Sequence, residues 1–95
     1  MINPVLKRAL KTWGEQAQML MAVEEMSELI KEILKNVNRR KNNIDAIIEE
    51  TADVEIMLEQ LKENYAIAAA VDAYKADKIK LIEQRLNDWD KNHAA

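Results

Sequence analysis

The sequence contains no cysteine, and it has one glycine, one proline and one histidine among its 95 residues. The absence of cysteine excludes disulfides and thiolate metal ligands. Because glycine and proline are scarce while alanine, leucine, isoleucine, glutamate and lysine are abundant, we predict an all-α fold. The single histidine, His93, argues against a zinc hydrolase and against a di-iron bundle, whose metal site uses Glu-x-x-His motifs.

Long apolar runs are also missing. No segment approaches the ~20 apolar residues that a membrane-spanning helix needs, and the N-terminal segment lacks the apolar core of a signal peptide. We therefore expect a cytoplasmic protein without membrane contacts. The net charge of −3 argues against nucleic-acid partners, because no face is predicted to be broadly basic. The length predicts one domain over residues 1–95, with its core at residues 13–89.

Apolar residues make up 48% of the chain although 33% is charged. This is a high apolar share for a small bundle that stands alone. Helices with apolar residues on more than one side would account for it, and such helices usually pack against other subunits. The composition therefore predicts a homo-oligomer.

Helical periodicity predicts a bundle of about four helices around a central antiparallel hairpin. The expected helices span residues 4–13, about 15–36, 44–64 and about 70–90. Asn3 suits the N-cap of the first helix, and Gly14 is a plausible break after it. Residues 36–43, rich in asparagine and arginine, are expected to form the hairpin loop, with Asn43 as the N-cap of the third helix.

Two acidic pairs stand out within this hairpin: Glu25 with Glu28, and Glu50 with Asp53. The i, i+3 spacing places the members of each pair on one side of a helix. If the helices fold back about residue 39, Glu25 lies level with Asp53, and Glu28 with Glu50. Like charges about 4 Å apart repel by roughly 4 kcal/mol at an effective dielectric constant of about 20. The cluster would therefore need protons or a cation.

A solvated helix face is the alternative interpretation of these acids. Against it, the third helix carries six acids between Asn42 and Leu61 without any lysine or arginine, whereas solvated faces usually interleave charges. The spacing alone leaves both interpretations open. If a metal binds, an oxygen-only ligand set favours Mg²⁺, with Mn²⁺ as a second choice.

The runs WGEQAQMLMAVEEMSELIKEI (residues 13–33) and IIEETADVEIMLEQL (residues 47–61) closely resemble MazG-like nucleotide pyrophosphohydrolases. These enzymes belong to the all-α NTP pyrophosphatase superfamily, and the compact layout looks like its phage and bacterial short forms. The family signature, E-x-x-E followed by E-x-x-D, maps onto Glu25, Glu28, Glu50 and Asp53. The resemblance covers most of the chain and is strongest from Trp13 to Leu61.

The resemblance implies a Mg²⁺-dependent enzyme that cleaves a (d)NTP into a (d)NMP and pyrophosphate, in nucleotide-pool sanitation. The four acids would hold the metal, and Glu25 or Glu28 would take a proton from the attacking water. Two rival functions stay open. One is a non-catalytic helical interaction or regulatory module with the same fold, and the other is phosphoribosyl-ATP pyrophosphohydrolase.

Substrate-binding residues are less well defined. The resemblance suggests that Lys78 and Arg85 of the fourth helix grip phosphates, although Leu81 stands where a basic residue would be common. Trp13 is a candidate for stacking on a base, with core packing as the alternative. Gln16 and Gln18 are candidates for reading a base edge. The loop residues Arg39, Arg40 and Lys41 would either be solvated or reach a triphosphate from a neighbouring subunit.

Overall fold

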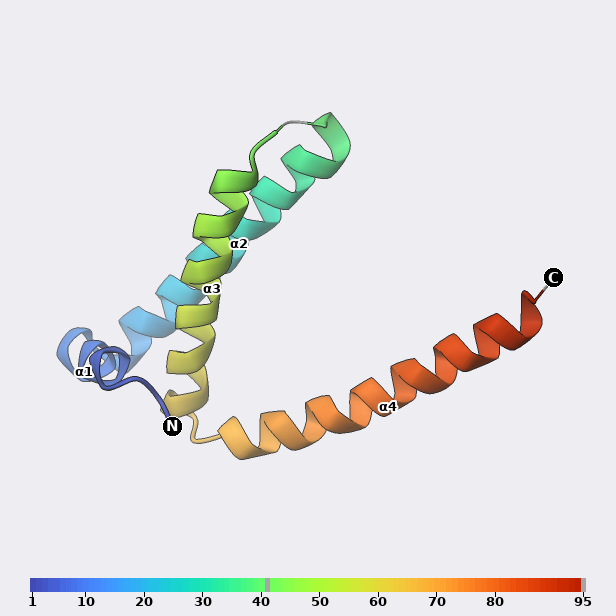
Figure 1. The fold of residues 1–95 in the computed structure, drawn as a ribbon. Coiled ribbons are helices and arrows are strands. Elements are labelled where there is room, and N and C mark those ends of the chain that lie inside the picture. Colours follow the sequence, from blue (N-terminus) through green and yellow to red (C-terminus); the bar gives the residue numbers. More distant parts are fainter. Residues whose placement is uncertain (41, 95) are drawn as a thin grey trace.

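The computed structural model describes residues 1–40 and 42–94, which form helices and no strand (Figure 1). The helices are α1 (Pro4–Trp13), α2 (Glu15–Arg39), α3 (Ile44–Asn64) and α4 (Ala68–Asn92). The predicted all-α class is confirmed. None of these helices is long and apolar enough to cross a membrane.

The first two helices begin and end where local chemistry predicts. The Asn3 side chain accepts a hydrogen bond from the Val5 backbone N–H at 2.9 Å, and Pro4 follows as the first helical residue. Gly14 separates α1 from α2 with φ 94, a conformation that side chains with a Cβ rarely adopt. Its N–H donates to the Leu10 carbonyl at 3.1 Å, which ends α1.

The hairpin loop between α2 and α3 is shorter than expected. Helix α2 continues to Arg39 instead of ending near Asn36, and Arg40 follows in the left-handed conformation with φ 52. Helix α3 begins at Ile44, as predicted. Lys41, one of the three basic loop residues, lies outside the described residues.

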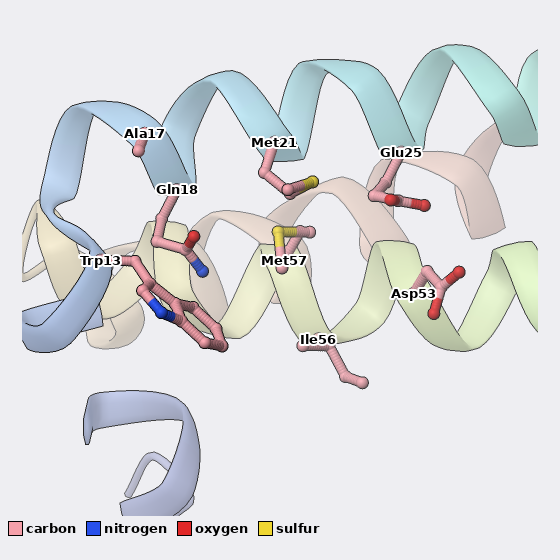
Figure 2. A pocket seen from close by; sticks show the side chains of 8 residues that line it. All are labelled: Trp13, Ala17, Gln18, Met21, Glu25, Asp53, Ile56 and Met57. Carbon is pink, nitrogen blue, oxygen red and sulfur yellow. The ribbon is translucent and has the colours of Figure 1, made fainter. Parts of the chain in front are cut away.

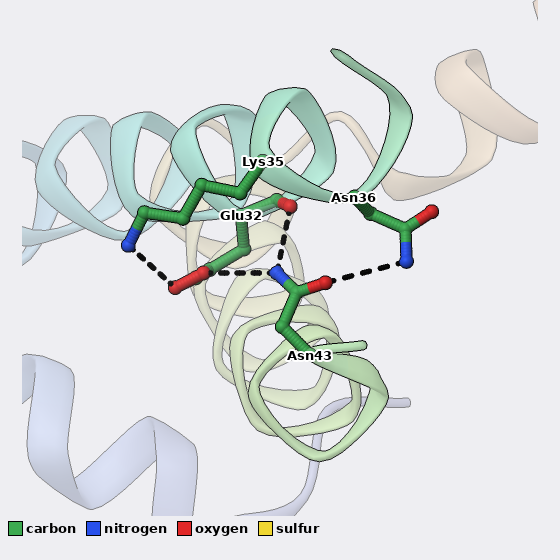
Figure 3. Close-up of polar contacts among 4 residues, drawn as sticks. All are labelled: Glu32, Lys35, Asn36 and Asn43. Atoms are coloured by element: carbon green, nitrogen blue, oxygen red, sulfur yellow. Dashed lines mark hydrogen bonds and ion pairs between the residues drawn. The ribbon is translucent and has the colours of Figure 1, made fainter. Parts of the chain in front are cut away.

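Asn43 is the N-cap residue of α3, as predicted, but its side chain makes no capping hydrogen bond. Its amide instead donates to the Glu32 backbone carbonyl at 2.9 Å and to the Glu32 carboxylate at 3.2 Å (Figure 3). Its side-chain oxygen accepts from the Asn36 amide at 3.3 Å, and Lys35 pairs with Glu32 at 3.3 Å. These contacts stabilise the hairpin because they tie the start of α3 to the last turns of α2.

The core is small and lies where α1, α2 and α3 meet. The buried apolar side chains of the described residues are Leu10, Ala22 and Val54. Two buried glutamines join them. The Gln18 amide donates to the Gln60 side-chain oxygen at 2.8 Å, and the Gln60 amide donates to the Leu6 carbonyl at 3.1 Å. This polar chain links α2, α3 and α1 inside the core.

Helix α4 does not pack on the hairpin. Among the described helices it contacts only α3, and it extends away from the other three (Figure 1). None of its residues is buried. The radius of gyration is accordingly 17.5 Å, whereas a compact chain of this length has about 12 Å. The expected four-helix bundle is therefore not formed within one chain, which has a three-helix core and a projecting helix.

Candidate metal centre

Three carboxylates converge between the two helices of the hairpin. Glu25 comes from α2, and Glu50 and Asp53 come from adjacent turns of α3. One oxygen of each lies within 4.8 Å of the other two. Figure 2 shows Glu25 and Asp53 on the facing sides of the two helices. The predicted antiparallel pairing therefore places opposing acids at one level, as a metal site requires.

Glu28 is not part of this group of three. Its side chain is exposed, whereas Glu25, Glu50 and Asp53 are half-buried. The spacing does not cause this, because both acidic pairs have the same offset of about 60° around their helix axes. The cause is the rotation of α2 against α3, which turns Glu25 rather than Glu28 towards Glu50 and Asp53. The structure thus brings together three of the four predicted ligands and leaves the fourth at the flank of α2.

Burial and like charges both act on the clustered acids. Partial burial raises the pKa of Glu25, and the negative charges of Asp53 and Glu50 raise it further. Partial burial also raises the pKa of Glu50, and the charges of Asp53, Glu49 and Glu28 add to the effect. The contribution of Glu28 shows that its charge still reaches the cluster. Protonation or a cation would relieve the repulsion at this site.

The donor set fits a hard divalent cation. All three ligands are carboxylate oxygens, which Mg²⁺ and Mn²⁺ prefer. In addition, Glu50 Oε2 is buried and has no hydrogen-bond partner among the described residues. A buried carboxylate oxygen without a partner is costly, and coordination to a cation would satisfy it. The predicted Mg²⁺ site is therefore compatible with the residues present.

An apolar pocket of about 490 Å³ lies beside the acids (Figure 2). Glu25 and Asp53 line one part of it, and the exposed indole of Trp13 lines another. The remaining lining residues are Ala17, Gln18, Met21, Ile56 and Met57. The structure therefore brings the predicted substrate residue Trp13 into the same pocket as two of the predicted metal ligands.

Lys78 and Arg85 are exposed on α4 and lie outside this pocket in the single chain. The Lys78 Nζ is instead 5.5 Å from the centre of the Tyr74 ring, within reach of a cation–π contact. Arg39 and Arg40 are exposed at the far end of the hairpin. A role of these basic side chains at the acids would thus require another copy of the chain.

Some pocket residues were not recognised from the sequence. Met21 and Met57, which the sequence does not single out as functional, both line the pocket. Helical spacing carries the missing signal, because Met21 precedes Glu25 by four residues and Met57 follows Asp53 by four. Gln18 was expected to read a base, but its amide is engaged by Gln60. No sequence pattern singles out Gln60.

Comparison of the chain with protein-family models, with curated proteins and with solved structures gave no match.

Proposed function

We propose that the protein is a Mg²⁺-dependent nucleoside triphosphate pyrophosphohydrolase that cleaves a (d)NTP into a (d)NMP and pyrophosphate. The observation that carries the proposal is the convergence of three carboxylates at an apolar pocket that also contains an indole. The resemblance of residues 13–61 to MazG-like enzymes supports it. A cation next to an apolar pocket suits a substrate that joins a polyphosphate to a flat base.

In this proposal Glu25, Glu50 and Asp53 hold the cation. When bound, Mg²⁺ supplies positive charge to the phosphates and makes a nearby water more acidic. Glu28 is the better placed of the two proposed proton acceptors, because it is exposed and lies outside the group of three. Glu25 would then orient the triphosphate through the cation. The Trp13 indole would stack on the base and exclude water from one side of it.

The proposal includes self-association of the chain. In a dimer or a tetramer, a second copy would pack with the first and complete a four-helix bundle that one chain does not form by itself. In such an assembly Lys78 and Arg85 of one copy would reach the phosphates bound by another. Both side chains are exposed.

The test is to incubate the purified protein with Mg²⁺ and each of the NTPs, dNTPs and phosphoribosyl-ATP, and to measure pyrophosphate. We expect release from at least one nucleotide. Asp53→Asn should lower kcat/KM by at least about a hundredfold, because it removes a charged ligand. Glu55→Gln is the matched control, since Glu55 is exposed on the same helix and outside the group. Absence of release and of Mg²⁺ binding by calorimetry would instead favour a non-catalytic interaction module.

A further inference from the structure

One side of α2 carries a second apolar stripe, which none of the described residues covers. Its residues alternate at spacings of three and four, which is the a/d pattern of a coiled coil. They are Leu20, Val23, Ser27, Ile30, Leu34 and Val37, here called the α2 seam. Each of its five apolar side chains is at least 52% exposed. Ala22 and Gln18, which are buried in the core, mark a different side of the helix.

The chain exposes more surface than a compact monomer of its mass. The chain exposes 7848 Å², whereas a compact monomer of 11.0 kDa exposes about 5,600 Å². The excess is roughly 2,200 Å² per chain, and a stable interface needs only about 800 Å² from each partner. Part of the excess belongs to α4, and the α2 seam is the other long apolar stripe.

The spacing of the α2 seam is symmetric about its own midpoint, between Glu28 and Leu29. Leu20 and Val37 lie at equal distances from this point, as do Val23 and Leu34, and Ser27 and Ile30. If a second α2 packs antiparallel on this seam, each a residue of one helix therefore lies level with a d residue of the other. This is the self-complementarity that an interface with twofold symmetry requires.

The size and charge of the residues fit the same arrangement. Ser27, the smallest residue of the seam, would face Ile30 of the second copy, and a surface pocket of about 450 Å³ lies beside Ser27 and Ile30. Glu24 directly follows Val23, and Lys31 directly follows Ile30, one heptad later. The two charged residues therefore flank the seam on the same side. Antiparallel pairing brings Glu24 of one chain beside Lys31 of the other, a pair of opposite charge.

We infer that two copies of this chain associate through the α2 seam, with the two α2 helices antiparallel about a twofold axis near Glu28 and Leu29. The pocket with Glu25 and Asp53 lies towards α3 and stays open in this dimer. The inference therefore specifies an interface for the oligomer named under the proposed function, but it does not depend on hydrolase activity.

Cysteine cross-linking tests the register directly, because the chain has no cysteine of its own. Positions 23 and 34 are about 16 Å apart along α2, too far for a disulfide within one chain. We expect the double variant Val23→Cys/Leu34→Cys to form a disulfide-linked dimer under mild oxidation, and neither single variant to do so. Equal cross-linking of Val23→Cys alone, or cross-linking of no variant, would overturn the antiparallel register.

Sedimentation equilibrium of the full chain tests the face itself. We expect a mass of at least twice 11.0 kDa. Leu34→Glu should raise the dissociation constant roughly a hundredfold, because the substitution occurs in both symmetric copies and each costs about tenfold. Glu24→Lys and Lys31→Glu should each weaken the dimer, and the two together should restore it. A monomer of wild type at all concentrations would overturn the proposal. So would a dimer that Leu86→Glu on α4 dissociates and Leu34→Glu does not.

Discussion

Replacement of Gln60 by leucine is expected to destabilise the fold far more than the small change in volume suggests. Gln60 is 1% exposed and Gln18 is 4% exposed, so water cannot replace either partner. The substitution removes the hydrogen bond from the Gln18 amide and the bond to the Leu6 carbonyl. It also leaves the Gln18 amide buried without this acceptor.

The magnitude follows from these contacts. Each hydrogen bond contributes about 1 kcal/mol net, and a buried donor without an acceptor costs a further ~1–3 kcal/mol. Burial of the leucine side chain offsets part of this loss. We therefore expect the free energy of unfolding to fall by about 2–4 kcal/mol, a large fraction of the ~5 kcal/mol typical of a chain this short.

Urea unfolding followed by far-UV circular dichroism measures the effect. Protein concentration must be held constant, because self-association raises apparent stability by mass action. Gln16→Leu is the matched control: it makes the same substitution at an exposed position of α2, where changes of about 0.5 kcal/mol or less are expected. The double variant Gln18→Leu/Gln60→Leu should lose less than the sum of the single variants, because it leaves no orphaned amide.

Two results would refute the reasoning. If Gln60→Leu and Gln16→Leu differed by less than about 0.5 kcal/mol, the buried glutamine pair would not stabilise the junction of the three helices. If the double variant equalled the sum of the two single variants, the two side chains would act independently, contrary to the contact between them.

Three further predictions concern the acids and the break between α1 and α2. Glu28→Gln should lower turnover, while Mg²⁺ binding measured by calorimetry persists. Loss of that binding would show that Glu28 is a metal ligand. The pKa of Glu50 is raised above its ordinary 4.5. The protonated Glu50 side chain therefore stabilises the fold fully below that pH, and this stabilisation is lost as the pH rises through the raised pKa. With metal removed by a chelator, the Tm of Glu50→Gln should therefore rise relative to that of wild type as the pH rises above 4.5, and a constant difference would contradict this. Gly14→Ala should cost about 1–3 kcal/mol in thermal unfolding, because φ 94 strains any residue with a Cβ even though the site has space.

Much of the local structure was predictable because it depends on near neighbours. The Asn3-Pro4 start, the break at Gly14 and the span of α3 all matched, since caps, backbone freedom and helical periodicity act within a few residues. The pairing of the two acidic helices also followed from their spacing on either side of residue 39. The boundaries that differed were helix ends, where a few residues more of helix cost little free energy.

Tertiary packing decided the rest. Which three of the four acids converge depends on how α2 is rotated against α3, and this rotation turns Glu25 rather than Glu28 towards Glu50 and Asp53. The burial of Gln18 and Gln60, and the use of Asn43 to hold Glu32, depend on partners that are distant in sequence. The path of α4 away from the core arises in the same way. Its apolar side chains follow a helical pattern, which indicates only that one face of the helix is to be buried. The pattern does not specify which neighbouring surface buries that face.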